Sequence, residues 1–165
     1  MFELKSISKD AIPHALERVE RYRLLNEPAV AVSICHEILH VDGENQPALI
    51  GLILASTDQF ALSSSVGINE VLALIPRLQD EYERAYYTGI IHERQAKSRL
   101  NRGYPGAGFD AYEHLHTAME WFERAEQNHR PGDEDAILRW NTCARIITER
   151  NLKARPHTEE HPMLE

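Results

Sequence analysis

The sequence predicts an all-α protein, a stack of antiparallel helical hairpins with about seven helices. Apolar residues recur at three- and four-residue spacing along nearly the whole chain, which is the pattern of amphipathic helices. No run of residues alternates between apolar and polar as a half-buried strand does. Prolines, glycines, aspartates and asparagines interrupt the helical pattern. The connections that they mark are short, so consecutive helices are expected to pack antiparallel.

Start and stop signals divide the chain into seven expected helices. They cover about residues 9–25, 28–41, 45–62, 69–79, 80–102, 110–128 and 133–151. Asp10 is a candidate N-cap for the first helix and Asn45 for the third, which also carries Pro47 in its first turn. The "SSSVG" stretch at 63–67 separates the third helix from the fourth. Pro76 predicts that the fourth helix is kinked or shortened.

Two capping-box patterns start the longest helices of the C-terminal half. Asp80-x-x-Glu83 begins the fifth helix and Asp110-x-x-Glu113 begins the sixth, with Asp in place of the usual Ser or Thr. The glycine- and proline-rich stretch "NRGYPGAGF", residues 101–109, lies between them. We expect it to form a long connection.

The last break, "HRPGDED", precedes the seventh helix, for which Asp133 is the expected cap. After that helix the chain carries two prolines and few apolar residues. The sequence therefore predicts one helical domain over residues 1–152 and a mobile C-terminal tail over residues 153–165.

Composition and charge narrow the classes of partner. The 165 residues are 42% hydrophobic and 27% charged, which is typical of a soluble single domain. The net charge of −8 and the lack of a basic stripe argue against nucleic acid and favour basic peptides or proteins. No signal peptide or membrane-spanning run is evident. Cys35 and Cys143 suggest no disulfide framework, so we expect a cytoplasmic protein.

Residues 12–45 resemble one unit of the tetratricopeptide repeat (TPR) family, a helix-turn-helix of roughly 34 residues. Tyr22 lies at the late aromatic site of the unit's first helix, and Ala31 lies at the small site where the two helices cross. Residues 41–45 are similar to the "LDPxN" ending of a repeat, with Gly43 in place of the usual proline.

A second resemblance lies in the sixth helix, where Ala118, Phe122 and Ala125 reproduce the A-x-x-x-F-x-x-A spacing of a repeat's second helix. Gly89 is similar to the small residue at which a repeat's first helix is closely approached. The chain departs from the family in its long loop before the sixth helix and in the hairpin 46–79, which matches only in its first helix. The resemblance implies a right-handed α-solenoid with the seventh helix as a C-terminal cap.

The TPR resemblance also implies a function without chemistry or cofactor. First helices of TPR hairpins line a concave groove that holds a peptide or protein, as in an adaptor or assembly factor. The groove-facing sites of the family fall on Glu20, Arg23, Thr57, Asp58, Tyr86, Glu93 and Arg94. The alternative for this set is a solvated face with intramolecular ion pairs. Some TPR proteins bind the terminal carboxylate of a peptide with Lys and Asn. The corresponding sites in this chain are Leu16 and Glu20, so we do not expect a partner that binds through its terminal carboxylate.

Residues 36–40 read HEILH, an H-E-x-x-H string. In zinc peptidases two such histidines bind the metal from one helix face, and the glutamate activates a water. Here the apolar face of the helix is centred near Ile38, which places His36 and His40 on the solvent side. Glu70, the nearest downstream third ligand, comes later than in zinc peptidases, and no strand is expected to hold a substrate. We therefore expect no metal site.

Two alternatives to an interaction module stay open. One is a zinc-dependent hydrolase that uses His36, Glu37 and His40. The other is a structural, self-associating protein whose exposed apolar groove is a homodimer contact.

Three remaining features are expected to be structural. His114 and His116 diverge by about 200° around a helix and are expected on the solvated surface. The glycine-rich stretch 103–108 lacks the Lys-Ser/Thr of a phosphate loop and is expected to be a plain connection. The alternative is a binding loop that presents Tyr104 and Phe109. Both tryptophans are expected to pack in the core or between hairpins.

Overall fold

The computed structural model describes residues 1–62, 66–128 and 130–157, and the regular elements in this part are all helices. The α-helices are α1 (Ile12–Leu24), α2 (Pro28–Val41), α3 (Gln46–Asp58), α4 (Ile68–Leu72), α5 (Glu81–Arg102), α6 (Ala107–Gln127) and α7 (Asp135–Glu149). Three short 3-10 helices accompany them, η1 (Lys9–Ala11), η2 (Gln59–Ala61) and η3 (Ile75–Arg77). The predicted all-α class with seven helices is confirmed for the described residues.

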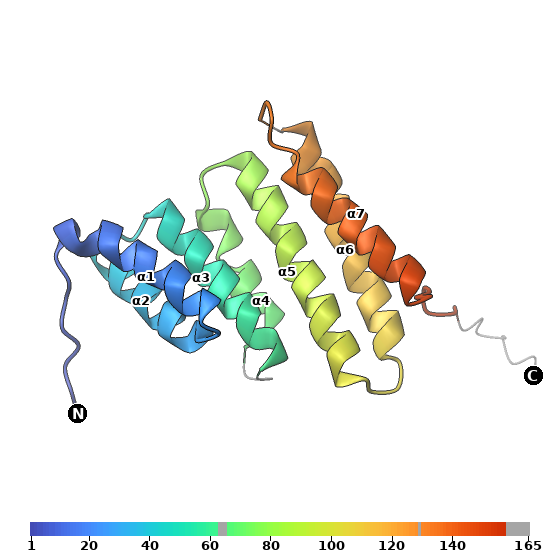
Figure 1. Ribbon diagram of the computed structural model, residues 1–165, viewed down its shortest axis with the longest axis horizontal. Helices are drawn as coiled ribbons and strands as arrows, with labels where there is room; N and C mark the ends of the chain where they lie inside the picture. The colour runs from blue at the N-terminus through green and yellow to red at the C-terminus, as the bar shows by residue number, and fades with distance from the viewer. Residues whose placement is uncertain (63–65, 129, 158–165) are drawn as a thin grey trace, which may run out of the picture.

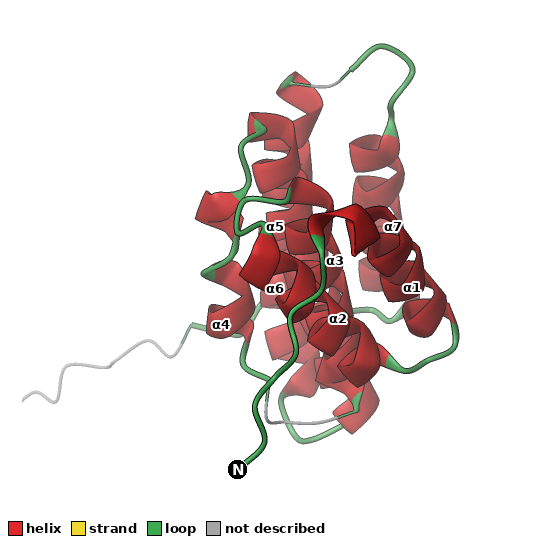
Figure 2. Cartoon of the chain, turned by 90° about the vertical axis from the view of Figure 1, so that its left-hand side faces the viewer, coloured by secondary structure: helices red, strands yellow, loops and turns green. Residues whose placement is uncertain are grey.

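The helices pack mainly against their neighbours along the chain. Figure 1 shows α1, α3, α5 and α7 toward the viewer and α2, α4 and α6 behind them, with α1 and α7 at opposite ends of the stack. Figure 2, turned by 90°, separates α4 and α6 on one side from α1 and α7 on the other. We call the surface formed by α1, α3, α5 and α7 the front face. No helix of the described residues is long and apolar enough to cross a membrane.

Three buried apolar clusters hold the helices together. One joins α1, α2 and α3, a second joins α3, η2, α4 and α5, and a third joins α5, α6 and α7. The small residue Ala31 is fully buried in the first cluster. Ala118, Phe122 and Ala125 are fully buried in the third, where both tryptophans also pack. The packing positions predicted for α2 and α6 are therefore confirmed.

Local capping signals set two helix starts as predicted. The side chain of Asn45 accepts a hydrogen bond from the amide of Ala48 at 2.9 Å, which starts α3. The carboxylate of Asp80 accepts from the amide of Tyr82 at 2.8 Å, which starts α5. Both interactions satisfy amides that the helix itself leaves unpaired.

Two other expected caps are wrong, and a proline effect is confirmed. Asp10 lies inside η1, and Ala11 occupies the N-cap position of α1. Asp133 lies two residues before α7 and accepts a hydrogen bond from the amide of Asp135 at 3.1 Å. α4 is only one turn and a half long, and Pro76 lies in the following η3, so Pro76 shortens the fourth helix as predicted.

The connection between α5 and α6 is much shorter than expected. Only residues 103–106 lie outside the two helices. Gly103 and Gly106 adopt φ of 64° and 86°, a left-handed conformation that reverses the chain within four residues. The prediction of a long loop is therefore wrong. Asp110 lies in the first turn of α6, which begins at Ala107, and does not cap it.

The stretches expected to be loop and tail are described only in part. Residues 63–65 of the serine-rich stretch and 158–165 of the tail lie outside the described residues. Within the described part of the tail, the guanidinium of Arg155 lies 2.6 Å from the carboxylate of Asp110 and 3.7 Å from that of Glu113.

Candidate functional site on the front face

The seven residues predicted to line a groove lie on α1, α3 and α5, three helices of the front face. The structure brings four of them, Arg23, Thr57, Asp58 and Arg94, into one cluster. The other three, Glu20, Tyr86 and Glu93, lie in different surroundings.

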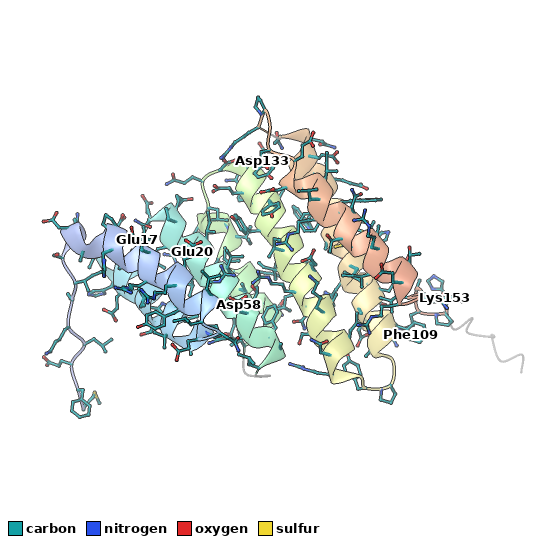
Figure 3. All side chains as sticks on the ribbon, in the orientation of Figure 1. Glu17, Glu20, Asp58, Phe109, Asp133 and Lys153 are labelled. Carbon is teal, nitrogen blue, oxygen red and sulfur yellow. The ribbon has the colours of Figure 1, made fainter. Side chains whose placement is uncertain are left out.

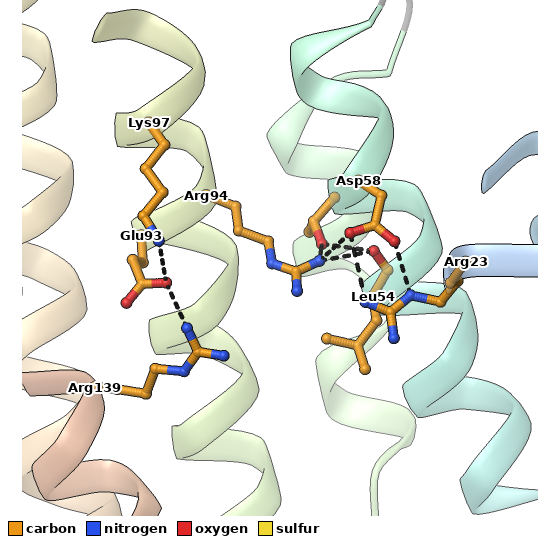
Figure 4. A network of polar contacts seen from close by, with 8 residues as sticks. Arg23, Leu54, Asp58, Glu93, Arg94, Lys97 and Arg139 are labelled. Atoms are coloured by element: carbon orange, nitrogen blue, oxygen red, sulfur yellow. Dashed lines mark hydrogen bonds and ion pairs between the residues drawn. The ribbon is translucent and has the colours of Figure 1, made fainter. Parts of the chain in front are cut away.

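The carboxylate of Asp58 lies between two guanidinium groups (Figure 4). Nε of Arg23 donates to one oxygen at 2.7 Å, and an Nη of Arg94 donates to the other at 2.5 Å. The same Nη of Arg94 also donates to the hydroxyl of Thr57 at 2.8 Å and to the carbonyl of Leu54 at 3.0 Å. Burial lowers the pKa of Arg94, and the charge of Asp58 opposes that shift. These contacts tie α1, α3 and α5 together.

Glu93 is the centre of a second cluster. Its side chain is fully buried, and its carboxylate accepts from Lys97 and from Arg139, each at 3.2 Å (Figure 4). The thiol of Cys143 donates to the other oxygen at 3.6 Å. Burial, followed by the charge of Glu93, raises the pKa of Cys143 to about 12, so this cysteine stays a thiol. The cluster ties α5 to α7.

Tyr86 belongs to an aromatic group on α5 and α6. Its ring stacks on Tyr82 with centroids 5.7 Å apart, and it lies 5.1 Å from Tyr87 and 5.8 Å from Phe122. The ring of Phe122 packs directly on Gly89, where a Cβ atom would be 2.5 Å from the nearest ring carbon. The predicted close approach at Gly89 is therefore confirmed.

Glu20 lies at a groove between α1 and α3 with a volume of about 370 Å³. Its lining includes the apolar residues Leu16, Ile50 and Leu54 and the acidic residues Glu17 and Glu20. The three apolar side chains are half-buried, whereas Glu17 and Glu20 are exposed on the front face (Figure 3). Sequence reasoning missed the apolar floor because α3 carries apolar residues on all sides, so its pattern does not single out an outward face.

The H-E-x-x-H string lies on α2, in the layer behind the front face. His36 and His40 are exposed, Glu37 is half-buried, and Ile38 is fully buried. No group of three or more His, Cys, Asp or Glu side chains is arranged to hold a metal ion within the described residues. The alternative third ligand, Glu70, lies on α4.

His114 is not on the solvated surface as expected. Its Nδ1 lies 3.1 Å from Nδ1 of His92 on α5, and the two half-buried rings stack with centroids 5.4 Å apart. Burial is the main cause that lowers the pKa of both histidines. The pKa of His92 falls to about 4. His116 is exposed, as predicted. Sequence reasoning missed the pair because only the packing of α5 on α6 brings these histidines together.

The rings of the short connection make contacts within the chain. The hydroxyl of Tyr104 donates to Asp110 at 2.5 Å and accepts from Arg99 at 3.2 Å. The guanidinium of Arg155 lies over the ring of Phe109, 5.4 Å from its centroid.

Comparisons of the chain with protein-family models, curated proteins and solved structures return no match. The basis for a functional proposal is therefore the geometry of the front face.

Proposed function

We propose that the chain is a non-enzymatic interaction module, a cytoplasmic adaptor or assembly factor whose TPR-like hairpins present the front face to a peptide or protein partner. The observation that carries the proposal is the open groove between α1 and α3, with its half-buried apolar floor. Apolar surface left open beside polar groups is characteristic of ligand and peptide sites.

The ion pairs beside the groove support this reading. Arg23 lines the groove and is held by Asp58, which also holds Arg94. The part of the groove that Arg23 lines is thereby fixed before any partner arrives. A preformed site loses less conformational entropy on binding, which favours affinity.

The packing of the helices supports a TPR-like solenoid. Small residues are fully buried in the clusters between helices, at Ala31 in α2 and at Ala118 and Ala125 in α6. Alternate helices lie in two layers, as in a stack of hairpins (Figure 1). In such a stack the first helices of the hairpins share one face, which here holds the groove.

Blocking the groove tests the proposal. Pro47 is exposed on the groove wall, and both native cysteines are buried. A bulky maleimide on Pro47→Cys is expected to weaken binding of a captured partner about tenfold or more. Unlabelled Pro47→Cys and labelled Glu149→Cys, on the exposed end of α7, are the controls. Undiminished binding with the groove blocked would overturn the proposal.

Self-association is the second candidate, and one observation favours it. Leu24, Leu25, Val30 and Leu62 are 81%, 58%, 40% and 61% exposed. Leu24, Leu25 and Val30 lie around the turn from α1 to α2, and Val30 and Leu62 line one hollow there. A strictly monomeric protein across a concentration series, measured by light scattering, would exclude this candidate. A dimer that Leu24→Asn/Leu25→Asn converts to a monomer would support it.

A further inference from the structure

We infer that the groove between α1 and α3 binds a basic apolar segment, a short stretch of a partner protein in which lysine or arginine lies beside apolar side chains. This inference rests on the proposed function and names the chemistry of its partner. It follows from the floor of the groove, from its rim and from the charge around it.

The floor sets the apolar part of the ligand. Leu16 of α1 and Ile50 and Leu54 of α3 line it, and all three are half-buried. Ligand cavities range from about 300 to about 1,000 Å³, so a groove of about 370 Å³ suits only a few side chains. An apolar side chain inserted there removes apolar surface of both partners from water.

The rim sets the charge of the ligand. Glu17 and Glu20 are exposed and lie one helical turn apart on α1 (Figure 3). Neither carboxylate has a hydrogen-bond or ion-pair partner in the part of the chain that the structure describes. Two like charges at this spacing repel each other. A cationic side chain between them would relieve that repulsion.

The cation that lines the groove does not fill this role. Arg23 lines the same groove, one turn beyond Glu20, but its guanidinium is bound to Asp58 at 2.7 Å. Among the described residues, the rim therefore keeps two carboxylates without an ion-pair partner above an apolar floor. The net charge of −8 adds to the attraction of a basic partner and to the repulsion of an acidic one.

Two designed peptides probe the groove. One is a fluorescent amphipathic helix of leucine and lysine, and the other carries glutamate in place of every lysine. The key variant is Glu17→Gln/Glu20→Gln. Its matched control, Glu44→Gln/Glu149→Gln, makes the same change in net charge at two exposed residues outside the groove. All four substitutions are on the surface and are expected to leave the fold intact.

We expect the lysine peptide to bind the wild-type chain and the glutamate peptide not to bind. The variant Glu17→Gln/Glu20→Gln loses two exposed charge contacts with the lysine peptide. We expect the affinity for this peptide to fall about tenfold, measured by fluorescence anisotropy at low salt. The control pair is expected to weaken it less than about twofold, since neither of its carboxylates lines the groove.

Other outcomes overturn the inference in distinguishable ways. Equal weakening by both pairs of substitutions, or no binding of the lysine peptide, would show that the rim does not select a basic ligand. Tighter binding of the glutamate peptide, abolished by the label on Pro47→Cys, would overturn the basic partner and leave the proposed function standing. The label on Pro47→Cys could also leave the binding of both peptides and of a captured partner unchanged. In that case the proposed function itself fails.

Discussion

Gly89 shows how one residue sets the distance between two long helices. A Cβ atom at this position would lie 2.5, 2.7 and 2.8 Å from three ring carbons of Phe122. The ring is fully buried and cannot move aside without displacing its neighbours. Gly89→Ala is therefore expected to lower the free energy of unfolding by about 1–3 kcal/mol, although alanine is the better helix former. Chemical denaturation followed by circular dichroism measures the change.

The matched control is Gly43→Ala in the turn before α3. There the nearest atom to an added Cβ is the carbonyl oxygen of Leu39 at 3.5 Å, an ordinary contact. This substitution is expected to change the free energy of unfolding by less than about 0.5 kcal/mol. Equal stability of Gly89→Ala and wild type would contradict the close packing of α5 on α6.

The pair of His92 and His114 predicts a loss of stability in acid. Burial first, then the charge of His114, lowers the pKa of His92 to about 4, and burial also lowers that of His114. Arg99 lowers the pKa of His114 further, and Asp110 and Glu113 oppose it. Unfolded histidine titrates near 6.5. Between these values the unfolded chain binds more protons, so stability falls as the pH falls from about 6.5 to about 4.

His92→Asn isolates this contribution. Asparagine keeps a hydrogen-bonding group near the position of Nδ1 but does not titrate. The free energy of unfolding lost between about pH 7 and about pH 4.5 is expected to be about 1–2 kcal/mol smaller in His92→Asn than in wild type. His36→Asn makes the same substitution at an exposed position outside the pair and is the control. Parallel curves for wild type and His92→Asn would refute the assignment.

At the scale of elements, signals carried by adjacent residues predicted the structure well. The caps at Asn45 and Asp80 and the effect of Pro76 depend on residues close in sequence. The start of α6 was wrong because two glycines with positive φ make a four-residue reversal. Glycine permits that conformation without requiring it, so the glycines alone do not distinguish a tight reversal from a longer loop. The capping-box pattern at Asp110 was misleading for the same reason.

Of the residues named from the sequence, Glu20 and Arg23 line the groove between α1 and α3, and the other five do not. The TPR resemblance named Arg23, Asp58 and Arg94, which do share one cluster. Other parts depend on which helices pack together. Glu93 is paired with Arg139, 46 residues later in the chain, and only the packing of α7 on the α5–α6 hairpin reveals that contact. The spacing of Glu93 and Lys97, one helical turn apart, was the one local signal available.

α2 carries the H-E-x-x-H string, and its orientation leads to a prediction. Because His36 and His40 are exposed, replacing either with alanine is expected to change the free energy of unfolding by less than about 0.5 kcal/mol. A chelator is expected to leave the melting temperature unchanged. Elemental analysis after purification without a nickel column supplies the decisive comparison. Stoichiometric zinc that disappears in His40→Ala would instead favour the hydrolase.

At the scale of the whole molecule, two kinds of interaction join the ends of the helix stack. The buried apolar clusters overlap at α3 and α5, each of which belongs to two of them. On the front face, Asp58 joins α1 and α3 to α5, and Glu93 joins α5 to α7 (Figure 4). The ion pairs therefore run across the same junctions as the apolar clusters, and each set limits how far the hairpins can separate.

Asp58→Ala tests how strongly the ion pairs of the front face couple the N-terminal half of the stack, α1 to α3, to the C-terminal half, α5 to α7. Asp58, Arg23 and Arg94 are between 21% and 26% exposed, so the substitution leaves two half-buried cations without their shared carboxylate. We expect a loss of about 2 kcal/mol in the free energy of unfolding. Because the α5–α7 cluster is untouched, hydrogen exchange is expected to quicken in α1 and α2 more than in α6 and α7. Glu149→Ala on exposed α7 is the control. Uniform quickening through all seven helices would show that the stack unfolds as one cooperative unit and that Asp58 does not join two separable halves.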